Sequence, residues 1–391
     1  MPNDVLVLVG LNGAGKSSVL QAFSFARMFA AGTPDRFFED RHWNSKDVRS
    51  QVGRKSPFIR FDLLLEGDGG QKYLWQFNWG INSGLNAREV VWRLDQDAFV
   101  PTRLLDFNRS SLTSDDERLS LRGVSPSGSI LSLVDRRPVD SSRNELVDLS
   151  LWASRISSLE LLSPSAMRRQ ARGAHTDIGE RGERLASFIA SLSTDAKARL
   201  ADRLSEFYPI TRIDTVKKRA GWVDMKIAET FRDVGPINTN HASDGFLRLL
   251  ALCAIPEFSA NSSVVLLDEI EDGIEPHILQ RLVERLSVDS KCQLFITSHS
   301  PIVVSFMQKN EVVLMGRTPD GRIVCRALSE LESIRRGQEY FGDGELWTMM
   351  DKDQLNSEIV SSSQTPQNGA EAEDYLKTRF SPRAVFDFMS I

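Results

Sequence analysis

The sequence predicts an α/β fold with a mostly parallel sheet flanked by helices, and three observations support this. Residues 5–9 are an apolar run, Val-Leu-Val-Leu-Val, that leads through a glycine loop into a helical segment. From residue 243 onward, helix and strand patterns alternate, which favours parallel strands joined by right-handed crossovers. Residues 57–79 hold two strand patterns around Glu-Gly-Asp-Gly-Gly, a hairpin signal that adds an antiparallel β subdomain.

The remaining elements follow in chain order. Residues 16–29 favour a helix, whereas residues 101 to about 150 are rich in Ser, Arg and Asp and are predicted to be loop or partly mobile. Beyond them the patterns predict helices over 145–207, a strand pair over 210–232, a helix near 244–254, a strand over 264–267, a helix near 276–287 and a strand over 293–297. The tail from about residue 360 has linker composition and ends in a short helix over 370–380.

Composition excludes several classes of protein. The chain has 391 residues, 41% of them hydrophobic and 26% charged, which fits a core-forming protein of two or three domains. Its 3 cysteines lack CxxC spacing, which argues against a disulfide framework or a cysteine zinc site. We find no long apolar run and no signal-peptide pattern, so we expect a cytoplasmic protein without a membrane partner. The net charge of −5 gives no global attraction to nucleic acid.

A phosphate-binding loop follows the first strand. Gly10-Leu-Asn-Gly-Ala-Gly-Lys16-Ser17 matches G-x-x-x-x-G-K-[ST] between a strand and a helix. The glycines let backbone N–H groups turn toward phosphates, and the helix N-terminus adds partial positive charge. Lys16 would reach the β- and γ-phosphates, and Ser17 would bind Mg²⁺. We therefore predict binding of ATP with Mg²⁺ by Asn12, Gly13, Ala14, Gly15, Lys16, Ser17 and Ser18.

Two carboxylates, Asp268 and Glu269, end the apolar strand over 264–267. In open α/β sheets, ligands bind at the carboxyl ends of the strands. Asp268 would hold Mg²⁺ and Glu269 would deprotonate the attacking water. The alternative is that Asp268 merely caps the following segment.

A histidine ends the next apolar strand, in Thr-Ser-His299-Ser-Pro. A loop histidine is by itself more often a surface or core residue than a functional one. Beside a phosphate loop and an acidic pair, we predict instead that His299 lies on the neighbouring strand near the γ-phosphate. The other four histidines lack such a context.

Ser243-Asp244-Gly245 opens an amphipathic helix 25 residues before Asp268. Ser243 is a plausible N-cap, which is the simpler interpretation. The alternative is that the same hydroxyl and free N–H groups face a γ-phosphate held by another subunit.

The order of these four motifs resembles the ABC-type ATPase heads of the SMC, RecF and OLD families. The sequences of the motifs are most similar to those of OLD-like (AAA_21-type) bacterial anti-phage ATPases, whose signature motif is Ser-Asp-Gly. Leu161-Leu-Ser-Pro-Ser-Ala-Met-Arg168, followed by Gly182-Glu-Arg-Leu-Ala, is similar to a segment that those families carry before the signature. The resemblance covers residues 5–315.

The resemblance implies two heads packed head to tail around two ATP molecules. Glu269, His299 and Lys16 would be catalytic, and Ser17 and Asp268 would bind the metal. Ser243, Asp244 and Gly245 would contact the partner's ATP in trans. The implied architecture is an N-terminal ATPase lobe with the hairpin (1–100), a helical lid insertion (101–235), a C-terminal ATPase lobe (236–330) and an extension with tail (331–391).

The sequence departs from the family pattern in three places. OLD-type nucleases add a Toprim domain with clustered carboxylates. Beyond His299 lie Asp343, Glu345, Asp351 and Asp353, but Asp351-Lys-Asp353 does not follow an apolar strand, so we interpret these carboxylates as solvated and expect no nuclease activity in this chain. Gln51 and Gln76 are both open as the Mg²⁺-sensing glutamine. The usual histidine after the acidic strand is Glu275 here, with His277 displaced by two.

Two functions are open. The first is an ATP-gated sensor or regulatory subunit of bacterial anti-phage defence, dimeric or larger, that controls a separately encoded effector, most plausibly a nuclease. The second is a RecF-like ATPase of DNA repair or recombination that binds nucleic acid directly. Residues 101–220 carry 20 Lys/Arg against 16 Asp/Glu, a local bias that suits phosphate contacts, although a mixed solvated surface explains it equally well.

Overall fold

The structure is a computed structural model of the chain. It describes residues 5–49, 56–67, 70–94, 101–108, 111–114, 117–120, 126–134, 141–231, 235–308, 310–331, 333 and 351–361. The chain folds into two compact units. The first consists of Met1–Gln21, Arg155–Met315 and Arg326–Ile359, and the second consists of Ala22–Ser154, Gly316–Cys325 and Val360–Ile391. This division into two units does not test the four predicted domains, which stay predictions.

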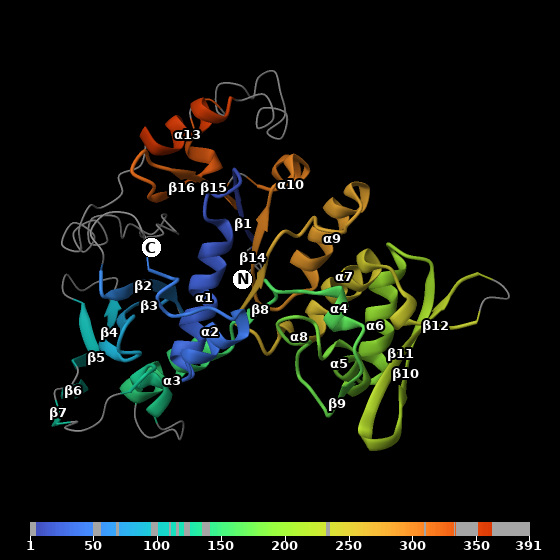
Figure 1. Ribbon diagram of the computed structural model, residues 1–391, viewed down its shortest axis with the longest axis horizontal. Coiled ribbons are helices and arrows are strands. Elements are labelled where there is room, and N and C mark those ends of the chain that lie inside the picture. The colour runs from blue at the N-terminus through green and yellow to red at the C-terminus, as the bar shows by residue number, and fades with distance from the viewer. Residues whose placement is uncertain are drawn as a thin grey trace. The chain divides into compact units, whose positions relative to one another are not determined.

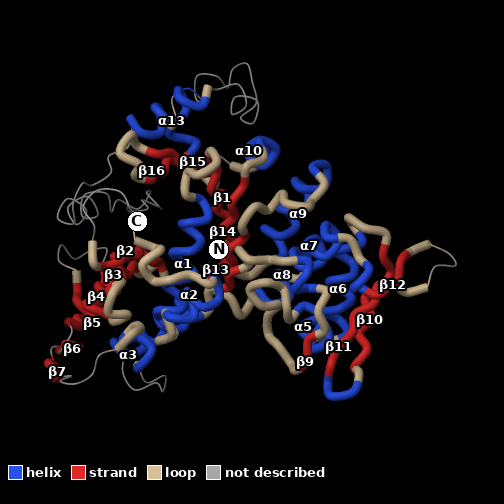
Figure 2. The backbone as a smooth tube through the Cα atoms, viewed as in Figure 1, coloured by secondary structure: helices blue, strands red, loops and turns tan. Residues whose placement is uncertain are grey.

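A six-stranded sheet with the order β16-β15-β1-β14-β13-β8 organises the first unit (Figure 1). β1 pairs in parallel with β14 and β15, and β13 pairs in parallel with β14 and β8. Figure 2 shows β1, β14 and β13 next to one another. The strand bounds are β1 Val5–Gly10, β8 Ser157–Ser158, β13 Val264–Leu267, β14 Gln293–Ser298, β15 Val312–Arg317 and β16 Ile323–Ala327. The predicted α/β class with a mostly parallel sheet is confirmed.

Helices join and cover these strands. α1 follows the phosphate loop, α9 connects β13 to β14, and α10 follows β14. α9 buries Leu279, Leu282, Val283 and Leu286 at helical spacing, which is why its sequence pattern predicted a helix. The bounds are α1 Lys16–Ala30, α9 Pro276–Asp289, α10 Pro301–Phe306, α13 Lys352–Ser361 and the 3₁₀ turn η4 Leu328–Glu330. None of the helices in the described part of the chain has the length and apolar character that a membrane span requires.

A small antiparallel sheet lies in the same unit, with the order β10-β11-β12 and β9 paired to β11. α6 packs on β10 and α5 on β11, and Figure 1 shows α5 to α8 gathered beside this sheet. Its strands are β9 Ala171–Arg172, β10 Ile210–Lys217, β11 Trp222–Glu229 and β12 Ile237–Asn238. The helices are α4 Pro164–Met167, α5 Leu185–Ser191, α6 Thr194–Ser205, α7 Asp244–Cys253 and α8 Ile255–Ser259, with 3₁₀ turns η2 Arg219–Gly221 and η3 Thr239–His241.

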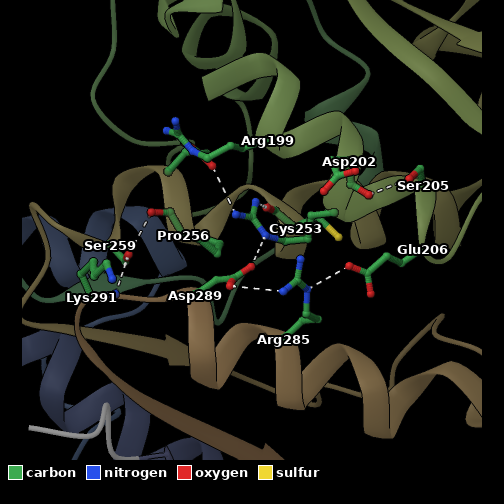
Figure 3. Close-up of polar contacts among 12 residues, drawn as sticks. Arg199, Asp202, Ser205, Glu206, Cys253, Pro256, Ser259, Arg285, Asp289 and Lys291 are labelled. Atoms are coloured by element: carbon green, nitrogen blue, oxygen red, sulfur yellow. Dashed lines mark hydrogen bonds and ion pairs between the residues drawn. The ribbon is translucent and has the colours of Figure 1, made fainter. Parts of the chain in front are cut away.

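A buried ion-pair network ties α6 to α7 and α9. Arg203 Nε lies 2.9 Å from Asp289 Oδ2, and its Nη1 donates to the Cys253 carbonyl at 2.6 Å. Figure 3 shows Arg285 between Asp289 and Glu206, with Nε 2.9 Å from Glu206 Oε1. Burial raises the pKa of the Cys253 thiol to about 12, so this cysteine stays protonated at neutral pH.

The second unit is built on an antiparallel sheet with the order β2-β3-β4-β5-β6-β7. Its core is aromatic: Phe25 stacks on Phe61, and Phe29 on Phe77 at 4.1 Å between ring centroids. The strands are β2 Phe58–Glu66, β3 Lys72–Gly80, β4 Asn86–Leu94, β5 Thr102–Asn108, β6 Ser111–Ser114 and β7 Glu117–Ser120. The helices are α2 Asp35–Arg41, α3 Ser141–Ser154 and the 3₁₀ turn η1 Ile130–Leu133.

Glu89 is a buried carboxylate in this unit. Trp75 Nε1 donates to it at 2.9 Å, Asn86 Nδ2 at 2.8 Å and the Ile130 N–H at 2.7 Å, and the Ser129 hydroxyl donates as well. Burial raises the pKa of Glu89, and the four hydrogen bonds counteract that rise in part. Because β4, β3 and η1 all contribute donors, the carboxylate clamps the sheet to the segment after β7.

The structure corrects two predictions of secondary structure. Residues 101–150 are not loop in their described parts, because β5, β6, β7, η1 and α3 lie there. These short strands add one after another to the edge of β4, so pairing with a neighbour defines them more than their own periodicity. Residues 145–207 are not continuously helical, since Pro164 and the positive-φ Gly173, Gly179 and Gly182 interrupt the helices.

Other predicted elements are confirmed. β2 and β3 form the predicted hairpin, β10 and β11 the predicted strand pair, and α7, β13, α9 and β14 the predicted alternation. The predicted linker and the helix over 370–380 lie outside the described residues, as do Gln51, Asp343 and Glu345. Asp351 and Asp353 are exposed at the start of α13.

Candidate functional site

The phosphate loop joins the carboxyl end of β1 to α1. Gly10 must be glycine, because a Cβ there would lie 2.6 Å from the Met315 carbonyl oxygen on β15. Gly13 and Gly15 have φ of 77° and 95°, in the region that favours glycine. Asn12 and Gly13 are exposed, Ser18 is half-buried and Ala14 is buried. The loop thus has the backbone that a phosphate cradle needs.

Lys16 lies at the centre of the site and is only 5% exposed. Its Nζ donates to the Gly10 carbonyl at 2.9 Å and the Leu11 carbonyl at 3.3 Å, and lies 3.2 Å from His299 Nδ1. Burial lowers the pKa of Lys16, while nearby carboxylates, Asp268 first, partly restore it. Lys16 is therefore a poorly solvated cation among acceptors, a state that a phosphate group would stabilise.

The register of the sheet brings the predicted residues together. Val9 is opposite Ser298 across β1 and β14, and Leu267 is opposite Ile296 across β13 and β14. β14 therefore lies between the two motif-bearing strands, and all three end at one edge. His299 follows β14 at that edge, between Lys16 and the acidic pair.

Asp268 and Ser17 form an oxygen-donor pair. Ser17 Oγ donates to Asp268 Oδ1 at 3.2 Å, and Thr297 Oγ1 donates to the same oxygen at 2.5 Å. Two oxygens on adjacent corners of a Mg²⁺ octahedron are about 3 Å apart for bonds of 2.0–2.1 Å. The pair therefore fits the predicted metal site, with hard oxygen donors at a suitable separation.

Glu269 has an unusual backbone for a residue that is not glycine, with φ of 48°. Its N–H donates to Thr297 Oγ1 at 2.8 Å, so one buried hydroxyl holds both acidic residues. The carboxylate is half-exposed, and its Oε1 lies 3.6 Å from His299 Nε2. A side chain placed this way is open to a water molecule at the edge of the sheet, as a general base requires.

Ser243, Asp244 and Gly245 form the start of α7. Ser243 Oγ accepts the Phe246 N–H at 3.2 Å, so the hydroxyl caps the helix, and Arg168 pairs with the exposed Asp244 at 2.5 Å. A Cβ on Gly245 would lie 2.5 Å from the Gly273 carbonyl, so the two backbones are in contact. Ser243 and Asp244 are exposed, which leaves this helix end accessible to another molecule.

Sequence reasoning missed two residues of the site, Thr297 and Glu271. Glu271 Oε1 accepts the His299 backbone N–H at 2.5 Å, and its charge contributes to the field at Lys16. The signal for Thr297 was a polar residue at the end of a buried strand. Gln76 hydrogen-bonds Asp62 and Trp92 within its own sheet, and His277 pairs with Glu275 at an exposed position.

Comparisons with known proteins agree with a nucleotide site. A family model described as "AAA domain, putative AbiEii toxin, Type IV TA system" matches residues 5–305. A search of curated proteins finds no match.

Among solved structures, the chain is similar to an Smc head bound to the C-winged helix domain of ScpA, with 13% identity and a TM-score of 0.44 over 84% of this chain and 92% of that chain. An Smc head with an extended coiled coil from Pyrococcus furiosus, bound to the C-terminal domain of ScpA, has 11% identity and a TM-score of 0.43, over 87% of this chain and 94% of that chain. The SMC head domain from Thermotoga maritima has 10% identity and a TM-score of 0.40, over 83% of this chain and 90% of that chain.

Proposed function

The chain belongs to the AAA domain family AAA_21, and from this we propose that it binds and hydrolyses ATP. One observation carries the proposal. Lys16 is more than 250 positions from Asp268 and His299 in the chain, yet the three residues meet at the carboxyl edge of three adjacent strands. That edge is where ligands of open α/β sheets bind.

Each residue would have a separate task. The N–H groups of the phosphate loop and Lys16 would bind the β- and γ-phosphates of ATP. Glu269 would accept a proton from the attacking water, and His299 would orient the γ-phosphate between Lys16 and that carboxylate. Ser17 and Asp268 would hold Mg²⁺, which would offset the negative charge of the phosphate groups.

We further propose that two copies assemble head to tail around ATP. The exposed start of α7, with Ser243, Asp244 and Gly245, would contact the ATP that the partner's phosphate loop holds. ATP binding then joins the heads and hydrolysis separates them. We also propose that the chain is a regulatory subunit that controls a separate effector, a nuclease, in bacterial anti-phage defence. The family description, which names a putative toxin of a type IV TA system, supports a role beside a toxic activity.

ATP trapping by a Glu269→Gln variant tests the ATPase and the dimer together. Without the base, the variant should bind ATP, hydrolyse it at least about 100-fold more slowly, and become dimeric when weighed with ATP. Lys16→Ala is the matched control, and it should lose nucleotide binding and stay monomeric. If Glu269→Gln hydrolysed ATP at the wild-type rate, the assignment of the base would be wrong.

Co-purification tests the regulatory role. The tagged chain would be expressed with its genomic neighbours and the isolated complex weighed with and without ATP. A stoichiometric neighbour with a nuclease or other toxic fold supports the regulatory subunit. A chain that purifies without a partner protein and dimerises only with ATP favours an ATPase that acts without a separate effector.

Direct nucleic-acid binding is the second candidate function, and the β10–β11 hairpin favours it. Over residues 169–172 and 210–229 there are seven Lys/Arg against three Asp/Glu, in a chain of net charge −5. Lys217 and Arg219 are exposed at the turn, and Trp222 is 39% exposed with the Arg172 guanidinium 5.5 Å from its ring centroid. Cations beside an exposed aromatic ring suit phosphate contact and base stacking.

Salt-dependent binding tests this second function. A Lys217→Ala/Arg219→Ala variant should bind DNA more weakly and lower the slope of log affinity against log salt by about two, one per lost phosphate contact. Lys218 is left in place because it pairs with Asp224. Lys291→Ala, an exposed cation on another element, serves as the control. Equal slopes for wild type and the double variant would exclude the hairpin as the contact.

A further inference from the structure

Glu271 connects the acidic segment after β13 to the histidine after β14. Its Oε1 accepts the backbone N–H of His299 at 2.5 Å, across 28 positions of chain. His299 is the first residue beyond β14, so the ladder of the sheet ends just before it. The carboxylate of Glu271 therefore takes over the role of a neighbouring strand and fixes the backbone of His299.

The position of that backbone sets the position of the ring. The His299 ring lies with Nδ1 3.2 Å from Lys16 Nζ and Nε2 3.6 Å from Glu269 Oε1. A shift of the backbone would change both distances at once. Displacement of about 1 Å at a reacting centre is enough to cost about 100-fold in rate.

The residues after Glu271 contact α7. Asp272 Oδ2 pairs with Arg248 Nη1 at 2.6 Å, and the Gly273 carbonyl abuts Gly245 so closely that no Cβ fits between them. Gly245 and Arg248 are both on α7, one turn apart. The segment 271–273 therefore joins the exposed start of α7 to His299.

Charge gives Glu271 a second link to the site. Its carboxylate is one of the three that raise the pKa of Lys16 against burial. Its Oε2 is buried and accepts no hydrogen bond from the described residues, so the negative charge is only partly compensated.

We propose that Glu271 is a positioning residue that transmits the position of the α7 start to the ring of His299. This rests on the proposed function, because the α7 start is the part that would contact the ATP of the partner. Seating of that helix end on the partner's nucleotide would act through Gly273 and Glu271 to align His299 in its own subunit. ATP hydrolysis in one head would then depend on dimer formation.

Three variants separate this role from a merely structural one. Glu271→Ala removes the acceptor, whereas Glu271→Gln keeps an oxygen that can accept the His299 N–H but lacks the charge. Glu275→Gln, an exposed residue of the same loop, is the matched control. We expect Glu271→Ala to lower kcat for ATP hydrolysis about 100-fold with KM within about 3-fold of wild type. Glu271→Gln should restore most of kcat, and the thermal midpoints should stay close.

A spectroscopic measurement observes the contact without turnover. With selective ¹⁵N-histidine labelling, the chain gives five backbone amide signals, and the one lost in His299→Gln belongs to His299. Glu271→Ala should shift that amide proton upfield, whereas Glu271→Gln and Glu275→Gln should leave it near its wild-type position.

The outcomes are distinct. Wild-type kcat in Glu271→Ala, an equal loss in Glu275→Gln, or an unmoved His299 amide overturns the positioning role while leaving the ATPase intact. A wild-type chain that hydrolyses no ATP overturns the proposed function instead, and the amide shift still decides whether Glu271 holds His299.

Discussion

Nδ1 of His299 lies 3.2 Å from Nζ of Lys16, although 283 positions separate the two residues. A lysine ammonium only donates hydrogen bonds, so Nδ1 is the acceptor in this contact, while Nε2 of the same ring faces Glu269. The ring thus bridges the phosphate-binding cation and the proposed base. His299→Ala should lower kcat for ATP hydrolysis by about 100-fold and leave ATP affinity little changed.

Steady-state kinetics and equilibrium nucleotide binding measure the two effects separately. His277→Ala, which removes an exposed histidine that pairs only locally with Glu275, is the control. A His299→Ala variant with lost ATP affinity and unchanged kcat would contradict the predicted role.

Gly245→Ala should disturb the start of α7. The added Cβ would lie 2.5 Å from the backbone carbonyl of Gly273, so one of the two segments must move, at a cost of about 1–3 kcal/mol. We expect weaker ATP-dependent dimerisation, measured by mass in the Glu269→Gln background. Gly235→Ala is the control, because nothing lies within 4 Å of a Cβ there. Equal dimerisation of both variants would show that the α7 start is not the contact.

Arg203→Ala should destabilise the first unit. The guanidinium is buried against Asp289, Glu257 and the Cys253 carbonyl, so its removal leaves buried charge uncompensated and costs about 3–5 kcal/mol. Arg199→Ala is a matched control, because Arg199 also pairs with Glu257 but is 61% exposed and should matter little. Thermal denaturation compares the two, and equal midpoints would refute the expectation.

Glu89 should give the second unit a characteristic pH dependence. Burial raises its pKa above the ordinary 4.5, so the folded chain holds the proton more tightly than the unfolded chain. Its contribution to stability is therefore complete below pH 4.5 and is lost as pH rises through the raised pKa. Glu89→Gln cannot titrate, so the free energy of unfolding of wild type minus that of the variant should fall as pH rises.

Chemical denaturation at a series of pH values measures this difference. At every pH, the Glu89→Gln variant also places an amide NH₂ group against two hydrogen-bond donors. Its free energy of unfolding should therefore be lower than that of wild type by about 1–3 kcal/mol. A difference that grows with pH would mean that the hydrogen bonds outweigh burial at this carboxylate.

The sequence predicted which residues lie together where a motif follows a strand directly. Lys16, Asp268 and His299 each follow an apolar strand, and parallel strands end at one edge, so their meeting could be expected. The contacts of Thr297 and Glu271 could not be predicted. They depend on the register between β13 and β14, which no local sequence pattern encodes.

The second unit was harder to predict for a related reason. β5 to β7 are strands because each hydrogen-bonds its neighbour, and the short polar sequences of β6 and β7 carry little signal of their own. The hairpin of β2 and β3 was predictable, since its glycine-rich turn lies between two clear apolar patterns. The buried, hydrogen-bonded state of Glu89 could not be predicted from the sequence, because a carboxylate on a strand is ordinarily solvated.

The place of β1 in its sheet has a consequence for synthesis on the ribosome. β1 precedes the other strands of its sheet in the chain, yet its neighbours β14 and β15 begin only at Gln293 and Val312. An apolar, fully buried strand must therefore wait unpaired while most of the chain is translated. The phosphate loop therefore reaches its position beside His299 only after β14 has been synthesised.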